Sequence, residues 1–181
     1  MSEGGPRVES LLSTAIAVAA IAAAEPANAH ATLVPNEAPA DSFFNTSVNV
    51  PHGCDGAATL KVRVRIPDGV IGVKPQPKPG WELAIRKEKL ATPIVESHGR
   101  TITETVAELT WTGKLADENF DQFGIHMKLP DKPGETLYFP TVQECEKGVH
   151  RWIEIPAAGK SRGDYKEPAP FLRLLPKAQR Q

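Results

Sequence analysis

The sequence predicts an all-β protein, an antiparallel β-sandwich of about eight strands. Two observations lead to this prediction. Short segments in which apolar and polar residues alternate recur along the chain, and turns containing glycine or proline separate them. In addition, the 181 residues include 14 Gly and 17 Pro, and no stretch has the regular apolar spacing of a long amphipathic helix. The length suits a single domain with a hydrophobic core of its own.

The clearest strand is predicted at residues 61–66, where Val62, Val64 and Ile66 alternate with three cations. Residues 125–129 alternate in the same way. The further predicted strands are residues 42–50, 70–74, 81–86, 101–111, 137–142 and 149–155. Between two of the strands, residues 116–123 are expected to form one helical turn.

Residues 1–29 are predicted to be a signal peptide. Residues 11–24 form an uncharged apolar run of 14 residues, preceded by Arg7 and followed by the small-residue triplet ANA at 27–29. The run is shorter than the roughly 20 residues that a membrane-spanning helix needs, and its flanks match those of a secretory signal. An uncleaved apolar helix is the alternative. Cleavage behind the triplet would make His30 the first residue of the mature protein.

With cleavage after Ala29, the mature chain would consist of a β-sandwich domain at residues 30–156 and a proline-rich C-terminal tail at residues 157–181. Loss of residues 1–29 removes one arginine and three glutamates, so the formal net charge changes from -1 to +1. A balance so close to neutral argues against a nucleic-acid-binding protein. No later apolar run reaches the length of a membrane span, so the sequence predicts a soluble exported protein with no membrane anchor.

The two cysteines of the chain, Cys54 and Cys145, are expected to form a disulfide in an oxidising compartment. The bond would close a loop of about 90 residues and would hold the turn around His52 next to residues 145–152. The alternative is that both cysteines are thiolate ligands for Cu(I).

A chain that begins with His30 carries a primary amine and an imidazole on the same residue. The amine and the Nδ1 atom can close a six-membered chelate ring around a metal ion, and nitrogen-rich tetragonal sites favour Cu(II). The amine titrates at about pH 8, so a metal ion displaces its proton at modest cost. The alternative is that His30 has no role and merely follows the cleavage position.

Trp152 is a further candidate site residue. In residues 149–155 the aliphatic side chains share one face of the predicted strand, and Trp152 lies on the opposite face with His150 and Glu154. A large aromatic side chain on the polar face of a strand is either covered by another element or used as a binding wall. The expected disulfide would bring Trp152 and His52 into one neighbourhood.

Several short stretches of sequence resemble the YcnI-like family of exported copper-binding proteins, which accompany bacterial copper uptake and resistance systems. Their order and spacing carry the resemblance, which extends from residue 30 to about residue 156. The stretches are HATL at 30–33, PNEAP at 35–39, VPHGC at 50–54, IPDGV at 66–70, KPGW at 78–81, FPTVQ at 139–143 and VHRW at 149–152.

The resemblance implies an immunoglobulin-like β-sandwich that binds one Cu(II) ion through the amine and imidazole of its N-terminal histidine. It also implies a tryptophan beside the metal, which corresponds to Trp152, and a glutamate ligand in a Val-Pro-x-Glu motif. In this chain Gly53 stands at the position of that glutamate. Either His52 replaces the carboxylate, or another acid such as Glu37 supplies it, and we favour His52. The C-terminal membrane anchor of some relatives is not found here, which agrees with a free periplasmic protein.

The predicted function is therefore that of a periplasmic Cu(II)-binding protein in copper homeostasis, a chaperone and not an enzyme. Its expected partners are the copper ion and either a membrane copper transporter or another copper chaperone. One alternative is a copper monooxygenase-like enzyme, because such enzymes hold copper in a brace of an N-terminal and a second histidine. The other is a copper-free exported interaction module. The chain contains no CxxC, HExxH or GxSxG motif that would indicate redox, zinc-protease or serine-hydrolase chemistry.

Overall fold

The computed structural model describes Met1, residues 30–95 and residues 99–177, so the predicted signal peptide lies, apart from Met1, outside the described residues. The described residues form strands and one short 3-10 helix, η1 (Arg162–Asp164), and no α-helix. The strands are, in chain order, β1 (Thr32–Val34), β2 (Glu37–Pro39), β3 (Phe43–Val50), β4 (Thr59–Arg65), β5 (Ile71–Pro75), β6 (Glu82–Val95), β7 (Thr101–Leu115), β8 (Asp121–Lys128), β9 (Thr136–Tyr138), β10 (Thr141–Cys145), β11 (Val149–Trp152) and β12 (Phe171–Leu175).

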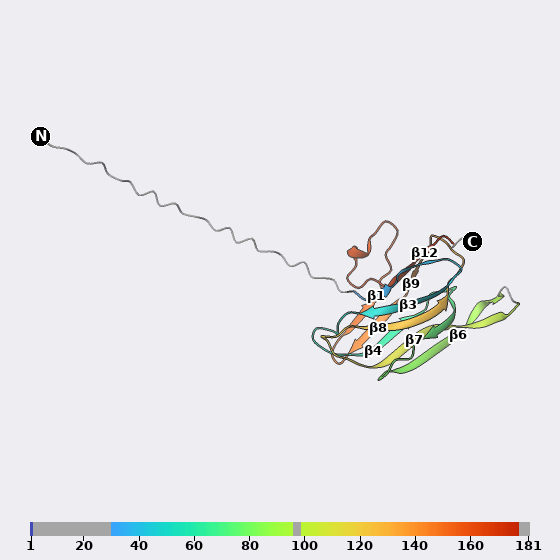
Figure 1. Cartoon of the computed structure of the whole chain (residues 1–181), viewed down its shortest axis with the longest axis horizontal. Coiled ribbons are helices and arrows are strands. Elements are labelled where there is room, and N and C mark those ends of the chain that lie inside the picture. Colours follow the sequence, from blue (N-terminus) through green and yellow to red (C-terminus); the bar gives the residue numbers. More distant parts are fainter. Residues whose placement is uncertain (2–29, 96–98, 178–181) are drawn as a thin grey trace.

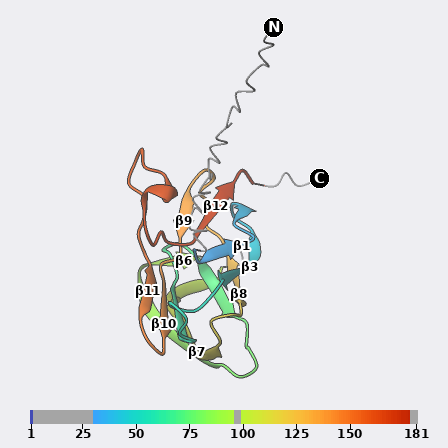
Figure 2. The same ribbon diagram turned by 90° about the vertical axis from the view of Figure 1, so that its left-hand side faces the viewer.

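The strands form three sheets (Figures 1 and 2). A four-stranded sheet has the order β1-β3-β8-β5, a five-stranded sheet has the order β11-β10-β4-β7-β6, and a small sheet has the order β2-β12-β9. All neighbouring strands are antiparallel except β12 and β2, which run parallel. The prediction of an antiparallel β-sandwich is confirmed.

The alternation of side chains along the strands produces the core between the two larger sheets. Val62 and Val64 on β4 are fully buried, and the cations that alternate with them lie on the outer face. From the opposite sheet, β8 contributes Phe123, Ile125 and Met127, none of which is more than 2% exposed. The alternation of apolar and polar residues that predicted these strands therefore matches the alternation of buried and exposed side chains.

Two local predictions were wrong. Residues 137–142, predicted as one strand, are divided into β9 and β10, and Pro140 between them has no N–H group to continue a ladder. Residues 116–123 do not form a helical turn, because β8 already begins at Asp121. Before it, the N–H of Asn119 donates to the carbonyl of Ala116 in a single turn.

The segment predicted as a proline-rich tail ends in a strand of the sandwich. In β12, Leu172 and Leu174 are at most 1% exposed, and the strand pairs with β2 and β9. Residues 153–170 therefore run as a strap between two strands that are both anchored in sheets. No helix within the described part of the chain has the length and apolar character needed to cross a membrane.

Candidate metal site

Trp152 ends β11, the edge strand of the five-stranded sheet, and it is the buried residue of its segment. Its side chain is 4% exposed, whereas Val149, Ile153 and Ile155 are 41%, 42% and 52% exposed. The sequence pattern correctly placed Trp152 on the face opposite the aliphatic side chains. In the structure the Trp152 face is the buried one. The alternation also ends at Trp152, because the N–H of Ile153 turns back to the carbonyl of Arg151.

Gln143 on β10 joins Trp152 to the turn that carries His52. The Gln143 side chain is completely buried, and its Nε2 atom donates to the His52 carbonyl at 2.7 Å and to Thr59 Oγ1 at 2.8 Å. Its Oε1 atom accepts a hydrogen bond from Trp152 Nε1 at 3.2 Å. One buried amide therefore fixes the position of the His52 turn relative to the indole.

The disulfide between Cys54 and Cys145 is present, as predicted, with its Cα atoms 6.0 Å apart. It connects the chain directly after His52 to the end of β10. Cys54 also exchanges two backbone hydrogen bonds with Ala57 across a tight turn. A Cβ atom on Gly53 would lie 2.1 Å from the Ala57 carbonyl oxygen, so this backbone has no room for a glutamate at that position.

His30 lies directly before β1, and its imidazole packs against Trp152 with ring centroids 5.5 Å apart. The Nε2 atom of His30 is buried and has no hydrogen-bond partner. Burial lowers the pKa of His30, and the charge of Arg162 lowers it further. A hydrogen bond with the Lys166 backbone and the charge of Glu167 act in the opposite direction without reversing the shift. The imidazole is thus held in the neutral form that binds metals.

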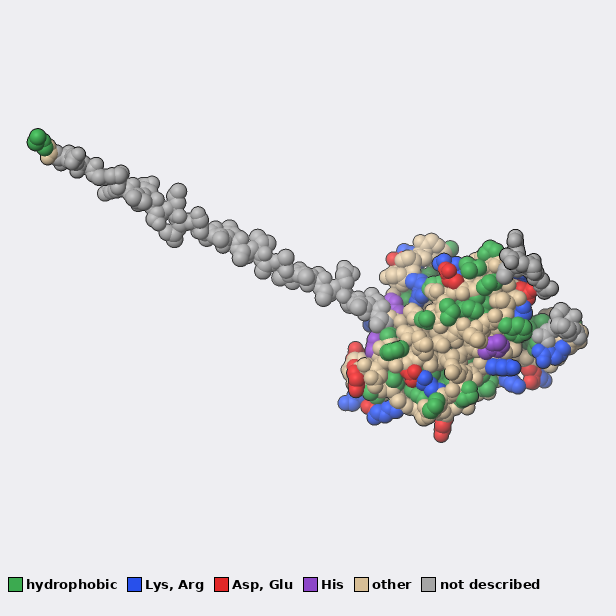
Figure 3. All heavy atoms as spheres, viewed as in Figure 1, with side chains coloured by type: hydrophobic (Ala, Val, Ile, Leu, Met, Phe, Trp, Pro, Cys, Tyr) green, Lys and Arg blue, Asp and Glu red, His purple; other side chains and the backbone are tan. Residues whose placement is uncertain are grey.

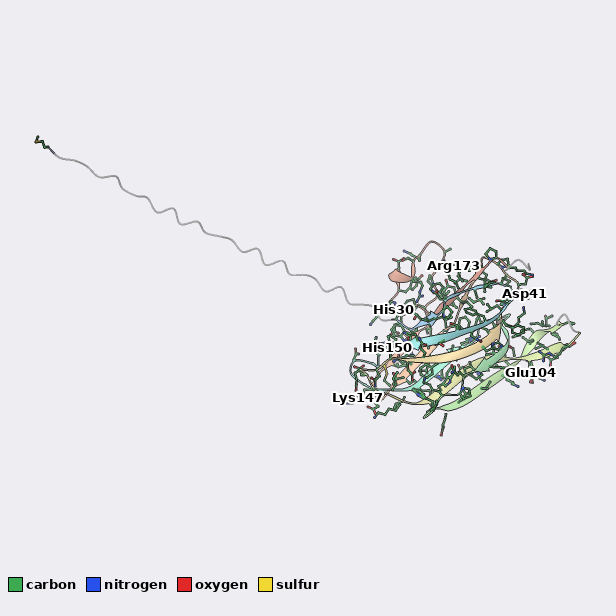
Figure 4. All side chains as sticks on the ribbon, in the orientation of Figure 1. His30, Asp41, Glu104, Lys147, His150 and Arg173 are labelled. Atoms are coloured by element: carbon green, nitrogen blue, oxygen red, sulfur yellow. A yellow bond between two sulfur atoms is a disulfide. The ribbon has the colours of Figure 1, made fainter. Side chains whose placement is uncertain are left out.

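His150 and His52 complete a row of aromatic rings at this end of the domain. His150 stacks on Trp152 with centroids 4.8 Å apart and planes inclined by 25°, and His52 meets His150 edge-on at 5.9 Å. Figure 4 shows His30 and His150 at the same end of the sandwich, and Figure 3 shows histidine surface there. The structure therefore brings together His30, His52 and Trp152, and it adds His150.

Sequence reasoning placed His150 beside Trp152 but did not name it as a site residue. The signal that identifies it is strand register, because His150 pairs with Gln143 across β10 and β11. The register of a hairpin edge is set by its turn and by its neighbours, and the sequence alone did not show it.

Glu167, on the strap after η1, also escaped prediction. Its carboxylate accepts hydrogen bonds from His150 Nδ1 at 2.8 Å and from the backbone N–H of Arg151 at 2.9 Å. Burial alone would raise the pKa of Glu167, but the hydrogen bonds from His150 and from the Arg151 backbone, together with the charge of Lys166, hold it below its ordinary value. The ionised carboxylate is therefore a fixed acceptor beside the imidazole.

Glu37, the alternative acid, lies elsewhere. It is on β2, and its carboxylate pairs with Arg173 Nη1 on β12 at 2.7 Å. Among the described residues, no interaction links Glu37 with His30, His52 or Trp152. Of the two residues considered in place of the missing glutamate, His52 is the one that the fold brings to the aromatic cluster.

The side chains at this end of the domain do not form a complete metal site by themselves. Within residues 30–95 and 99–177, no three His, Cys, Asp or Glu side chains stand close enough to hold a metal ion as they are. In the full chain the nitrogen of His30 is a peptide amide, because residue 29 precedes it. Two buried imidazole nitrogens, Nε2 of His30 and Nε2 of His150, nevertheless have no partner. An unpaired buried polar atom costs about 1–3 kcal/mol, and coordination of His150 Nε2 would remove that cost. The chelate proposed for His30 would use Nδ1 and the new amine, so the donors at this end of the domain suit a metal ion.

Comparisons with known proteins agree with this fold. A solved structure of an uncharacterized protein from Nocardia farcinica, described as having an immunoglobulin-like fold, is similar with a TM-score of 0.59 and 25% sequence identity. The similarity covers 81% of this chain and 98% of that protein. A search of curated proteins found no significant match. Residues 30–174 match the family described as "Domain of unknown function (DUF1775)". This chain has an immunoglobulin-like fold and belongs to the DUF1775 family, the domain family of the YcnI-like proteins.

Proposed function

We propose that this protein is exported to the periplasm and binds one Cu(II) ion at His30 once residues 1–29 have been removed. The observation that carries the proposal is the position of His30. Its imidazole lies against Trp152 and is kept neutral by burial and by Arg162. Cleavage would add a primary amine on the same residue, and amine and imidazole together form a chelate.

His52 supplies a further nitrogen in this proposal. Its Nδ1 atom lies 2.6 Å from the carbonyl oxygen of Gly53, and because a carbonyl only accepts, Nδ1 carries the proton. In the neutral form of this tautomer, Nε2 presents its lone pair to a ligand. The site would hold copper for transfer to a membrane copper transporter or to another copper chaperone, and it would act by binding and not by catalysis.

A titration of the chain that begins at His30 tests the proposal. Cu(II) is added in competition with a chelator of known affinity, with Trp fluorescence and EPR as readouts. We expect one equivalent to bind, with a nitrogen-rich tetragonal EPR signal that is lost in His30→Ala. His126→Ala is the matched control, because His126 lies on β8 and stacks on Phe43, with ring centroids 5.7 Å apart, instead of on Trp152.

Acetylation of the His30 amine separates the chelate from the imidazole alone. We expect the acetylated chain to bind Cu(II) much more weakly, although every side chain is unchanged. Equal affinity with and without the acetyl group would contradict the amine chelate. If the chain binds no copper in stoichiometric amount, the copper-free interaction module becomes the better explanation of the fold.

A further inference from the structure

We propose that His52 and His150 form a two-histidine metal site of their own, which binds a divalent transition-metal ion through two Nε2 atoms without the amine of His30. This inference depends on the proposed function in one respect: metal ions must have access to this end of the domain. In the mature protein the pair would contribute to the copper site. In the full chain, whose His30 nitrogen is an amide, it would be a weaker site that is already present.

The hydrogen bonds of the two rings select the tautomer that a metal site needs. Nδ1 of His150 meets the Glu167 carboxylate at 2.8 Å, and Nδ1 of His52 meets the Gly53 carbonyl at 2.6 Å. Both oxygens only accept, so both Nδ1 atoms carry protons. In the neutral tautomer that carries its proton on Nδ1, the Nε2 atom has a free lone pair, and Nε2 of His150 is buried with no partner.

The distance between the rings suits a shared ion. Their centroids are 5.9 Å apart and their planes are inclined by 85°. With metal–nitrogen distances of about 2.0–2.1 Å, two imidazoles on one ion have centroids up to about 6 Å apart. The separation of the two rings therefore lies within the range found for two imidazoles on one ion.

Both histidines are held by contacts that do not involve His30. His52 lies beside the Cys54–Cys145 disulfide, and its carbonyl accepts from Gln143. His150 is part of β11, stacks on Trp152 and donates to Glu167. The arrangement in which a metal-binding histidine donates its other N–H to a carboxylate is common at metal sites, because it fixes the ring and makes it a better donor.

The donors determine which ions are expected. Two imidazole nitrogens suit Cu(II), Ni(II) and Zn(II), and the Irving–Williams order makes Cu(II) the tightest of the three. The two cysteines form a disulfide, so they supply no thiolate. Water would complete the coordination of an ion held by the pair alone.

The test uses the full chain of residues 1–181 with His30→Ala, in which the N-terminal histidine chelate is absent. Cu(II) is titrated against a competing chelator, EPR counts the coupled nitrogens, and the shift of the unfolding midpoint by the ion gives a second measure of binding. We expect one equivalent to bind with two coupled imidazole nitrogens. Adding His52→Ala or His150→Gln should weaken binding at least about tenfold and leave one coupled nitrogen, and Glu167→Gln should weaken it by about 10–100-fold. Adding His126→Ala should change nothing.

The outcomes distinguish this proposal from the proposed function. If the His30→Ala full chain binds no Cu(II) while the chain beginning at His30 does, the two-histidine site is refuted and the proposed function stands. If the full chain binds but the loss of His52 or His150 leaves its affinity and EPR signal unchanged, the ion lies elsewhere and the proposal is also refuted. Metal-free unfolding midpoints establish that each variant is folded, and His150→Asn replaces His150→Gln if the latter is not.

Discussion

Gln143→Leu is the substitution that most directly tests how the aromatic cluster is held. The wild-type side chain is completely buried and forms hydrogen bonds with the His52 carbonyl, Thr59 Oγ1 and Trp152 Nε1, and its Nε2 atom also has a long contact of 4.0 Å with Cys145 Sγ. Leucine has a similar size but offers no polar atom. The substitution therefore removes the bonds and leaves the space filled.

The expected cost follows from the groups that lose their partners. Thr59 is completely buried and would keep only its 3.8 Å contact with Cys145 Sγ, and Trp152 is 4% exposed, so neither can turn to water. The His52 carbonyl lies nearer the surface. Each unsatisfied buried group costs about 1–3 kcal/mol, and the apolar burial of leucine offsets part of the sum. We expect the free energy of unfolding to fall by about 2–4 kcal/mol, which a domain of ordinary stability survives.

Urea unfolding of the two proteins, followed by Trp fluorescence and circular dichroism, measures this difference. Gln122→Leu on β8 is the matched control, because that side chain is exposed, and we expect it to change stability by less than about 0.5 kcal/mol. The reasoning also predicts weaker Cu(II) binding for Gln143→Leu, since the His52 turn is no longer tied to β10. A loss of stability below about 1 kcal/mol would refute the assigned network.

Three further predictions concern the same end of the domain. Replacing Cys54 and Cys145 by serine should lower the free energy of unfolding by about 4–5 kcal/mol, because the sequence separation of the bond is 91; a loss below about 1 kcal/mol in urea unfolding would contradict this. Glu167→Gln should reduce the acid sensitivity of the fold. The folded pKa of Glu167 is below its unfolded value of 4.5, so its stabilisation is present above that pH and is lost as the pH falls through the folded pKa. Unfolding in urea at a series of pH values measures this, and parallel curves for both proteins would refute it. Arg162→Gln should raise the pKa of His30, as followed by NMR titration of the imidazole, and an unchanged pKa would show that burial alone sets it.

The fold was predictable wherever one face of a strand meets the core. On β4 and β8 the alternation of apolar and polar residues coincides with burial, so the pattern located both strands. The three-residue strands β1, β2 and β9 are too short to show a period. β12 was missed because the prolines before it favoured an extended tail, and its pairing with β2 and β9 depends on segments far away in the sequence.

Only the part of the site that the disulfide connects could be predicted from the sequence. The expected disulfide correctly placed the turn of His52 next to the segment with Trp152. The role of Gln143 as a buried connector and the contact of Glu167 with His150 could not be predicted, because both depend on strand register and on the path of the strap. The absence of room at Gly53 likewise appears only when the Ala57 carbonyl is in place.

The distribution of unsatisfied atoms gives the strongest reason to regard this end as a binding site. Within the described residues, the buried side-chain nitrogens without a partner are Nε2 of His30, Nε2 of His150, Nε of Arg162 and Nε of Arg63. The first three lie together, since His30 and His150 both contact Trp152 and the charge of Arg162 acts on His30. Beside them, the Gln143 side chain forms hydrogen bonds with the His52 carbonyl, Thr59 Oγ1 and Trp152 Nε1. The buried Gln143 amide is hydrogen-bonded, whereas the two buried imidazole nitrogens beside it are not. Of these open atoms, only the two imidazole nitrogens can bind a metal ion, because the Nε atom of Arg162 carries a proton and can only donate.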